Sequence, residues 1–454
     1  MCYRPTSVKT ARSPLITLLV LATSACAIRL ANPEDSGPDG QVTGAAADCS
    51  KVAESDAPVP FGSAAPRLVG RFQVEGDGSA QFAWSGSEIA ARFTGSSSIS
   101  VRLSVPEKPD PGLEPRVNPE PDPEGKNRSF TVVIDRGEPT RLLVASPRDK
   151  DGKLERDKEG NAAERTYELA SRLDPAATHE VVLHRNFEAS GGILTFKGLQ
   201  LSPGGRFLQP LVRLDKDKKP RRILLIGDSI SCGFGVKGKN ASCLFSYGDQ
   251  DHYLTYGSIA ARTLDAELTT VCWSGRGLVR NRFDPGETLK TMPGLANYAA
   301  PSVEDSTKAA PAPAPLKPPQ DEDQTQAVVV NLGTNDVQRD NQESPAEFDV
   351  FLVGFLAEAK RFCLALLDRY PKAQVFFALS PMLSDNLGEP QRSSIRKTLR
   401  DAITSAKNPR AHYMEFSEQR GGRDGLGCSF HPSETTHKNM AGQLARAIQS
   451  KLCW

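Results

Sequence analysis

Four short sequence blocks hold residue types that together suit nucleophilic hydrolysis. In chain order they are Gly-Asp-Ser at 227–229, Trp-Ser-Gly-Arg-Gly at 273–277, Asn-Leu-Gly-Thr-Asn-Asp at 331–336 and Ser-Phe-His-Pro-Ser at 429–433. A serine hydroxyl is a weak nucleophile until a nearby imidazole accepts its proton, and the resulting oxyanion needs fixed N–H donors. The blocks contain the serine, the imidazole, glycine amides and an asparagine amide. They therefore predict acyl transfer, with Ser229 as nucleophile and His431 as its general base.

Each block lies next to an element that can position it. The apolar run 223–226 reads as a buried parallel strand, and similar runs occur at 268–272, 328–332, 375–379 and 412–416. Helical patterns lie between them, and the clearest begins with Ser344 as N-cap, Pro345 in the first turn and Glu347 three residues after the cap. In open α/β sheets, ligands bind at the carboxyl ends of the strands. We expect a mostly parallel sheet, covered on both faces, to gather the four blocks at one edge.

The N-terminal half follows a different pattern. Between 65 and 212, short runs with period two are separated by Gly, Ser, Asp and Pro, which predicts an all-β sandwich. Examples of these runs lie at 71–75, 80–84, 99–103, 129–134, 141–145 and 179–184. The stretch 105–127 holds seven prolines and reads as an inserted loop. Residues 301–326 hold six prolines and read as a flexible insertion in the second domain.

The four blocks resemble those of the SGNH (GDSL-type) hydrolases. The runs 227–236, 256–262, 273–281, 291–293, 328–336 and 431–433 are similar to carbohydrate esterase family 2 in particular. The resemblance covers roughly 65–454. It implies an α/β three-layer SGNH hydrolase domain over 219–454, preceded by an all-β jelly-roll sandwich over 65–212. The jelly roll could bind sugar or pack against the hydrolase domain, and we favour packing because no aromatic-rich strip stands out in it.

The resemblance also assigns roles to single residues. It implies Ser229 as nucleophile, His431 as base, and an oxyanion hole made of the Ser229 backbone N–H, the Gly275 backbone N–H and the Asn335 side-chain amide. Gly277 is the alternative to Gly275. Asp228 reads as a structural residue that holds the turn. No metal and no cofactor is expected.

One departure concerns the acid that orients the histidine. Family members often carry Asp two or three residues before it, and here those positions hold Ser429 and Cys428. Some members of the family use a backbone carbonyl instead. We therefore expect a Ser-His dyad with the Phe430 carbonyl as the orienter, and Asp424 as the alternative. Removing a triad member leaves substantial catalysis, so a dyad can be active.

The N-terminus has the layout of an export signal over 1–26, with basic residues before the apolar run 15–22. That run is shorter than the roughly 20 residues that span a bilayer. Cys26 is the candidate for lipidation, with cleavage after Ala25 or Ala27 as the alternative. Residues 27–64 read as a flexible tether. The chain contains nine cysteines and no CxxC pair, so a zinc site is not expected, and Cys232 and Cys243 are the candidates for a disulfide at the rim of the site.

With 56 basic and 55 acidic residues, the chain shows no sign of a nucleic-acid surface. The interpretation is an exported, monomeric O-acetyl esterase, lipid-anchored to the bacterial envelope or secreted. Its expected substrate is an acetylated polysaccharide or oligosaccharide of the xylan or mannan type, cleaved through an acyl-enzyme. One alternative is a GDSL-type lipase or thioesterase, against which the lack of a long apolar lid counts. Another is a non-catalytic carbohydrate-binding protein on an SGNH scaffold, which the missing acid favours.

Overall fold

The computed structural model describes part of the 454 residues. The described residues are 42–49, 58–106, 128–151, 153–158, 160, 163–243, 245–282, 284, 287–312, 324–337, 343–386 and 391–454. The export signal predicted at 1–26, including Cys26, lies outside them, as do 107–127 of the first proline-rich stretch and 313–323 of the second. Within the described ranges, no helix combines the length and the apolar content needed to cross a membrane.

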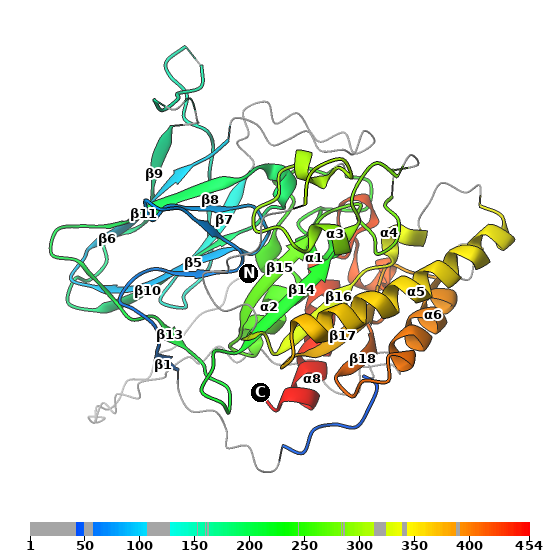
Figure 1. Ribbon diagram of the computed structural model, residues 1–454. Coiled ribbons are helices and arrows are strands. Elements are labelled where there is room, and N and C mark those ends of the chain that lie inside the picture. The colour runs from blue at the N-terminus through cyan, green and yellow to red at the C-terminus, as the bar shows by residue number, and fades with distance from the viewer. Residues whose placement is uncertain are drawn as a thin grey trace, which may run out of the picture.

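The C-terminal half is built on a five-stranded parallel sheet in the order β15-β14-β16-β17-β18 (Figure 1). Its strands are β14 (Arg222–Gly227), β15 (Glu267–Cys272), β16 (Ala327–Asn331), β17 (Gln374–Leu379) and β18 (Ala411–Glu415). The five apolar runs seen in the sequence therefore form the predicted parallel sheet. The strand order reverses between β14 and β16, and such a switch point is where sheets of this kind bind ligands.

Helices cover both faces of this sheet, because alternate residues of each buried strand point to opposite sides. One apolar core packs α5 and α6 on one face, and a second packs α2 and α8 on the other. The helices are α1 (Ser229–Cys232), α2 (Tyr256–Thr263), α3 (Met292–Leu295), α4 (Thr334–Val337), α5 (Pro345–Arg369), α6 (Gln391–Ser405), α7 (Gly421–Asp424) and α8 (Glu434–Leu452). Short 3₁₀ turns lie at η3 (His252–Leu254), η4 (Glu304–Ser306) and η6 (Cys428–Phe430). The predicted start of α5 is confirmed, because Ser344 and Glu347 form a capping box around Pro345.

The N-terminal half contains two larger antiparallel sheets that share one apolar core, and a separate two-stranded sheet of β1 and β13. Its elements are β1 (Val59–Pro60), β2 (Arg67–Val69), β3 (Gln73–Val74), β4 (Ala80–Phe82), β5 (Glu88–Thr94), β6 (Ser98–Ser104), β7 (Ser129–Ile134), β8 (Thr140–Leu143), β9 (Glu164–Ser171), β10 (Thr178–Arg185), η2 (Ala189–Gly191), β11 (Leu194–Leu201), β12 (Arg206–Leu208) and β13 (Leu211–Val212). This region is largely strands, as the period-two pattern predicts. The runs given as examples do not include β2, β5, β9, β11, β12 or β13, and β1 lies in the stretch that was expected to be a tether.

The two halves share buried contacts rather than meeting through a linker. Trp84 is 1% exposed; its indole N–H donates to the Tyr298 carbonyl (3.1 Å), and its ring lies edge-on to Trp273 at 6.4 Å. The buried Arg71 guanidinium donates to the Ala296 carbonyl at 2.6 Å. Trp84 belongs to the same apolar core as the α5 face of the parallel sheet. The β-rich half is therefore packed onto the α/β half as part of its core.

The expected flexible tether over 27–64 is wrong for its described residues. In 42–49, the Thr43 amide donates to the Tyr413 carbonyl at 2.9 Å, and Cys49 forms a disulfide with Cys453. Further along, β1 pairs with β13. A composition rich in Ala, Gly and Ser does not reveal these contacts, because backbone groups and one disulfide make them.

The first part of the proline-rich insertion is also ordered by contacts. Ser306 in 301–312 is fully buried and accepts a hydrogen bond from the Arg276 guanidinium at 3.1 Å. The Lys290 ammonium donates to the Asp305 carbonyl at 2.9 Å. Residues 301–312 therefore support the loop that carries the second sequence block, which corrects the expectation that they are flexible.

Candidate active site

Ser229 lies at the turn between β14 and α1. The Asp228 carboxylate accepts a hydrogen bond from the Ile230 amide at 3.0 Å and so caps α1, the structural role predicted for it. Gly227 is required by close packing, since a Cβ there would lie 2.0 Å from the Ser231 hydroxyl oxygen. Burial raises the pKa of the Asp228 carboxyl to about 7. The turn therefore places Ser229 at the carboxyl end of β14, next to the switch point.

His431 is within hydrogen-bond distance of Ser229. The two residues are 202 positions apart in the chain, yet the His431 Nε2 lies 2.8 Å from the Ser229 Oγ. The His431 Nδ1 lies 3.2 Å from the Cys428 carbonyl oxygen and 3.1 Å from that of Ser429. Because carbonyl oxygens only accept, Nδ1 carries the proton and Nε2 is free to accept the Ser229 proton. This tautomer is the one that a general base for Ser229 needs.

The imidazole of His431 is buried against an aromatic ring. Its centroid lies 4.3 Å from that of Phe234, and the residue is 8% exposed. Burial lowers the pKa of His431 to about 4, while the two carbonyls that accept from Nδ1 act in the opposite direction. Because burial dominates, the imidazole is neutral at neutral pH, as a base must be.

Both predicted orienters of His431 are wrong. The Phe430 carbonyl accepts from the Gln419 side-chain amide at 2.9 Å, and the Asp424 carboxylate pairs with Arg423 at 2.8 Å. The turn at Ser429 and Phe430 explains the difference, because its left-handed backbone (φ 53° and 62°) directs the carbonyls of Cys428 and Ser429 toward Nδ1. The orienting groups are backbone carbonyls, as expected, but they belong to Cys428 and Ser429, the two residues before Phe430.

The three proposed oxyanion donors follow three adjacent strands of the parallel sheet: Ser229 follows β14, Gly275 follows β15, and Asn335, on α4, follows β16. Asn335 is 4% exposed, and its side-chain amide donates one hydrogen bond to the Arg276 carbonyl at 2.9 Å. This contact places Asn335 beside the loop of Gly275. The Gly277 amide donates to the Asn281 side-chain oxygen (3.2 Å), which favours Gly275 over Gly277 as the donor.

A buried carboxylate that sequence reasoning did not single out joins two of the blocks. Asp336 accepts hydrogen bonds from the amides of Leu278 (2.9 Å), Val279 (2.7 Å) and Arg280 (3.1 Å). Burial raises its pKa and these three donors oppose the shift. Since Asp336 directly follows Asn335 on α4, it ties the loop of Gly275 to the helix that carries Asn335.

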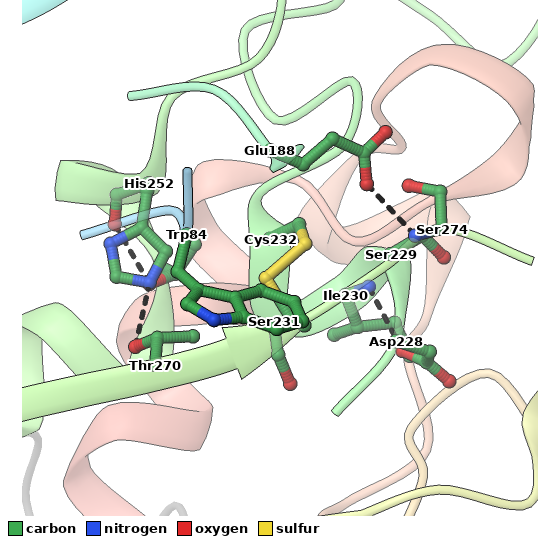
Figure 2. The surroundings of a disulfide bond; sticks show 12 residues. Trp84, Glu188, Asp228, Ser229, Ile230, Ser231, Cys232, His252, Thr270 and Ser274 are labelled. Atoms are coloured by element: carbon green, nitrogen blue, oxygen red, sulfur yellow. Dashed lines mark hydrogen bonds between the residues drawn. A yellow bond between two sulfur atoms is a disulfide. The ribbon is translucent and has the colours of Figure 1, made fainter. Parts of the chain in front are cut away.

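The β-rich half also contacts the Gly275 loop. Figure 2 shows the Glu188 carboxylate, which accepts a hydrogen bond from the Ser274 amide at 2.8 Å. Glu188 is 4% exposed, and burial raises its pKa. No sequence signal identifies Glu188, because its role depends on how the two halves pack.

The predicted Cys232–Cys243 disulfide is wrong. Cys232 is bonded to Cys272 at the end of β15 (Figure 2), and Cys243 is bonded to Cys428. Proximity in the chain was misleading, because Cys232 on α1 faces β15 while Cys243, eleven residues later, lies against the loop of His431. Cys363 is a free, buried thiol. Among the described residues, no group of His, Cys, Asp and Glu is arranged to hold a metal ion.

Comparisons with known proteins agree with this geometry. Residues 223–444 match the sequence model of the GDSL-like lipase/acylhydrolase family. The second half of the chain is therefore similar to this family. The GDSL-like domain and the half that precedes it are together similar to a solved family two carbohydrate esterase from Clostridium thermocellum in complex with cellohexaose. That likeness has 25% identity and a TM-score of 0.65, over 86% of this chain and 99% of that one. The resemblance to carbohydrate esterase family 2 is therefore confirmed.

Curated relatives of this GDSL-like hydrolase point the same way. The cellulase/esterase CelE of Acetivibrio thermocellus is 28% identical over 85% of this chain, and the chain spans 39% of the length of that relative. An acetylxylan esterase / glucomannan deacetylase of Cellvibrio japonicus is 23% identical over 86% of this chain and 89% of its own length. The similarity extends over both halves of the chain.

Proposed function

We propose that this protein is an exported O-acetyl esterase that removes acetyl groups from a polysaccharide of the xylan or mannan type. The observation that carries the proposal is the 2.8 Å contact between the His431 Nε2 and the Ser229 Oγ, with Nδ1 held by two carbonyls. The relative from Cellvibrio japonicus is named for acetylxylan and glucomannan, and a solved relative holds cellohexaose. Those names support a polysaccharide ester as substrate.

The chemistry follows from the positions of the groups. Ser229 attacks the acetyl carbonyl while the His431 Nε2 takes its proton. The amides of Ser229 and Gly275 and the Asn335 side chain hold the oxyanion. His431 then protonates the sugar oxygen as its bond to the acetyl carbon breaks, so the sugar leaves with a free hydroxyl and the acetyl group remains on Ser229. Water, deprotonated by the same imidazole, attacks the acetyl carbon. The bond to the Ser229 Oγ breaks, the imidazolium returns its proton to that oxygen, and acetate leaves.

Export is supported by the three disulfides found among the described residues, because such bonds persist in oxidising compartments. The leader at 1–26 would direct export, and lipidation of Cys26 would then anchor the mature protein, which acts as a monomer. The two antiparallel sheets of the N-terminal half would form a jelly roll whose main role is to pack against the hydrolase domain.

The substrate class is tested by acetate release from acetylated xylan and acetylated glucomannan, beside hydrolysis of p-nitrophenyl acetate and of a long-chain p-nitrophenyl ester. We expect release from at least one polysaccharide and a preference for the acetyl ester over the long-chain ester. A preference for the long-chain ester would favour a lipase. Retention of polysaccharide without any hydrolysis would favour a binding protein.

Replacing Asn335 with Ala tests the oxyanion hole. Loss of one donor to the oxyanion costs about 2.7–4 kcal/mol of transition-state stabilisation, so kcat should fall about 10²–10³-fold. KM should change little, because the donor acts on charge that develops only in the transition state. Steady-state kinetics on p-nitrophenyl acetate measure both. A large rise in KM at constant kcat would assign Asn335 to substrate binding instead.

The pH profile tests the base. Since burial lowers the pKa of His431 to about 4, the free enzyme should keep a neutral imidazole above that pH and lose it below. We therefore expect kcat/KM to rise with pH through an acid limb near pH 4 and to be level toward neutrality. If kcat/KM instead fell below about pH 6.5, the ordinary pKa of histidine, His431 would be solvated in the working enzyme.

A further inference from the structure

The loop that carries His431 lacks a carboxylate to orient the imidazole, and two backbone carbonyls do that work. The Nδ1–H donates to the carbonyls of Cys428 and Ser429 at 3.2 and 3.1 Å. A carbonyl can hold an imidazole only as firmly as its own backbone is held. The contacts that fix this backbone are therefore part of what positions the base.

The backbone at this point does not stay in place by its own preference. Ser429 and Phe430 both have left-handed φ values, 53° and 62°. For residues other than glycine, this conformation is unfavourable, because Cβ comes too close to the following carbonyl oxygen. Such turns persist where the surrounding structure holds them. Two in succession need a strong restraint beside them.

The restraint beside them is covalent. Cys428, immediately before the turn, is bonded to Cys243, with Cα atoms 4.8 Å apart. The Cys428 amide also donates to the Gly235 carbonyl at 3.1 Å. The two loops are so close that a Cβ on Gly238 would lie 2.4 Å from the Cys428 Sγ. Cys243 and Gly235 belong to the segment that follows the helix of Ser229, so the disulfide ties the histidine loop to the nucleophile's side of the site.

We propose that the Cys243–Cys428 disulfide is the positioning element that replaces the missing acid. It holds the Cys428 and Ser429 carbonyls against the Nδ1–H, and through them it aims the Nε2 at Ser229. Neither sulfur acts on the substrate, so the cysteines are positioning residues and not catalytic ones. The inference deepens the proposed esterase function and rests on it.

The Cys49–Cys453 disulfide provides a matched control. It ties the N-terminal segment 42–49 to the residue after α8, and neither cysteine belongs to the loops of Ser229 and His431. It closes a separation of 404 residues against 185 for Cys243–Cys428. Because the entropic contribution of a disulfide grows with loop length, removing the control bond should cost at least as much stability.

The test compares wild type with the double variants Cys243→Ser/Cys428→Ser and Cys49→Ser/Cys453→Ser, well below their melting temperatures. Acetate release from p-nitrophenyl acetate gives kcat and KM, and proton NMR follows the Nδ1–H of His431. We expect the first variant to lose about 10- to 100-fold in kcat, as a misaimed base does, with KM unchanged and the Nδ1–H resonance broadened or lost. The control variant should keep the wild-type kcat and resonance.

Two results would overturn the inference. One is a folded Cys243→Ser/Cys428→Ser protein with the wild-type kcat and resonance. The other is an equal loss of kcat in both variants, since it would reflect general destabilisation. Wild type that releases no acetate would instead overturn the proposed function, so the two failures are distinguishable.

A second route applies if the double variant does not fold. In the Cys49→Ser/Cys453→Ser protein, Cys232–Cys272 is fully buried and Cys243 is half-exposed, so dithiothreitol should open Cys243–Cys428 first. The dithiol supplies two electrons and two protons, giving two cysteine thiols and its own cyclic disulfide. We expect kcat to fall with an unchanged circular dichroism spectrum and to recover on reoxidation. An unchanged kcat, with both thiols verified by alkylation and mass spectrometry, would refute the inference.

Discussion

Replacing Ser229 with Ala should lower kcat for acetyl ester hydrolysis by about 10⁴–10⁶-fold, the range seen when the nucleophile of a serine hydrolase is removed. The reason is geometric: among the described residues, the Ser229 Oγ is the hydroxyl 2.8 Å from the His431 Nε2. Without it no acetyl-enzyme forms, and only the binding and oxyanion groups remain. Acetate release from p-nitrophenyl acetate and from acetylated xylan measures the loss.

Ser231 offers a matched control on the same short helix. Its hydroxyl is buried and lies 2.8 Å from the Tyr256 hydroxyl, not from His431. Ser231→Ala should therefore lower the free energy of unfolding by about 1 kcal/mol and leave kcat near the wild-type value. If Ser229→Ala kept most of the activity, or if Ser231→Ala lost as much, Ser229 would not be the nucleophile.

Replacing His431 with Ala should cost nearly as much as replacing Ser229, because the nucleophile and its base act as one unit. The double variant Ser229→Ala/His431→Ala should then be hardly slower than either single variant. Steady-state kinetics on p-nitrophenyl acetate with the three proteins give this comparison. Additive losses would mean that the two residues act independently.

Asp424→Asn is the control for the orientation of His431. The Asp424 carboxylate pairs with Arg423 and makes no contact with the imidazole. The substitution should leave kcat and the acid limb of the pH profile unchanged. A large drop in kcat would mean that Asp424 reaches His431 in the working enzyme and that a triad operates.

Sequence patterns were sufficient where local chemistry decides the structure. Buried parallel strands are nearly continuous apolar runs, so all five strands of the parallel sheet could be located from the sequence. Their carboxyl ends then indicated the edge of the sheet where the four blocks meet. The N-terminus of α5 was predictable because a capping box is formed by two residues only three positions apart, here Ser344 and Glu347. The strand β5 could also have been found, since the apolar residues Ile89, Ala91 and Phe93 stand at every second position of Glu88–Thr94.

The remaining features depend on contacts between distant segments. The pairing of Cys232 with Cys272 and of Cys243 with Cys428 follows from where α1 and the histidine loop lie in space. The same holds for Glu188, which reaches the Ser274 amide from the β-rich half. The carbonyls that orient His431 come from a turn in which Ser429 and Phe430 have left-handed backbone conformations. Neither residue type predicts this conformation.

The pH dependence of inactivation by a phosphonate tests whether a neutral His431 activates Ser229. The protein is treated with an alkyl p-nitrophenyl phosphonate over a range of pH, the inactivation rate is followed, and the modified peptide is identified by mass spectrometry. We expect one phosphonyl group, carried by Ser229, and a rate that falls as the pH drops through about 4, where His431 becomes protonated. Modification of another residue, or of Ser229 at a rate that does not depend on pH in this range, would contradict it.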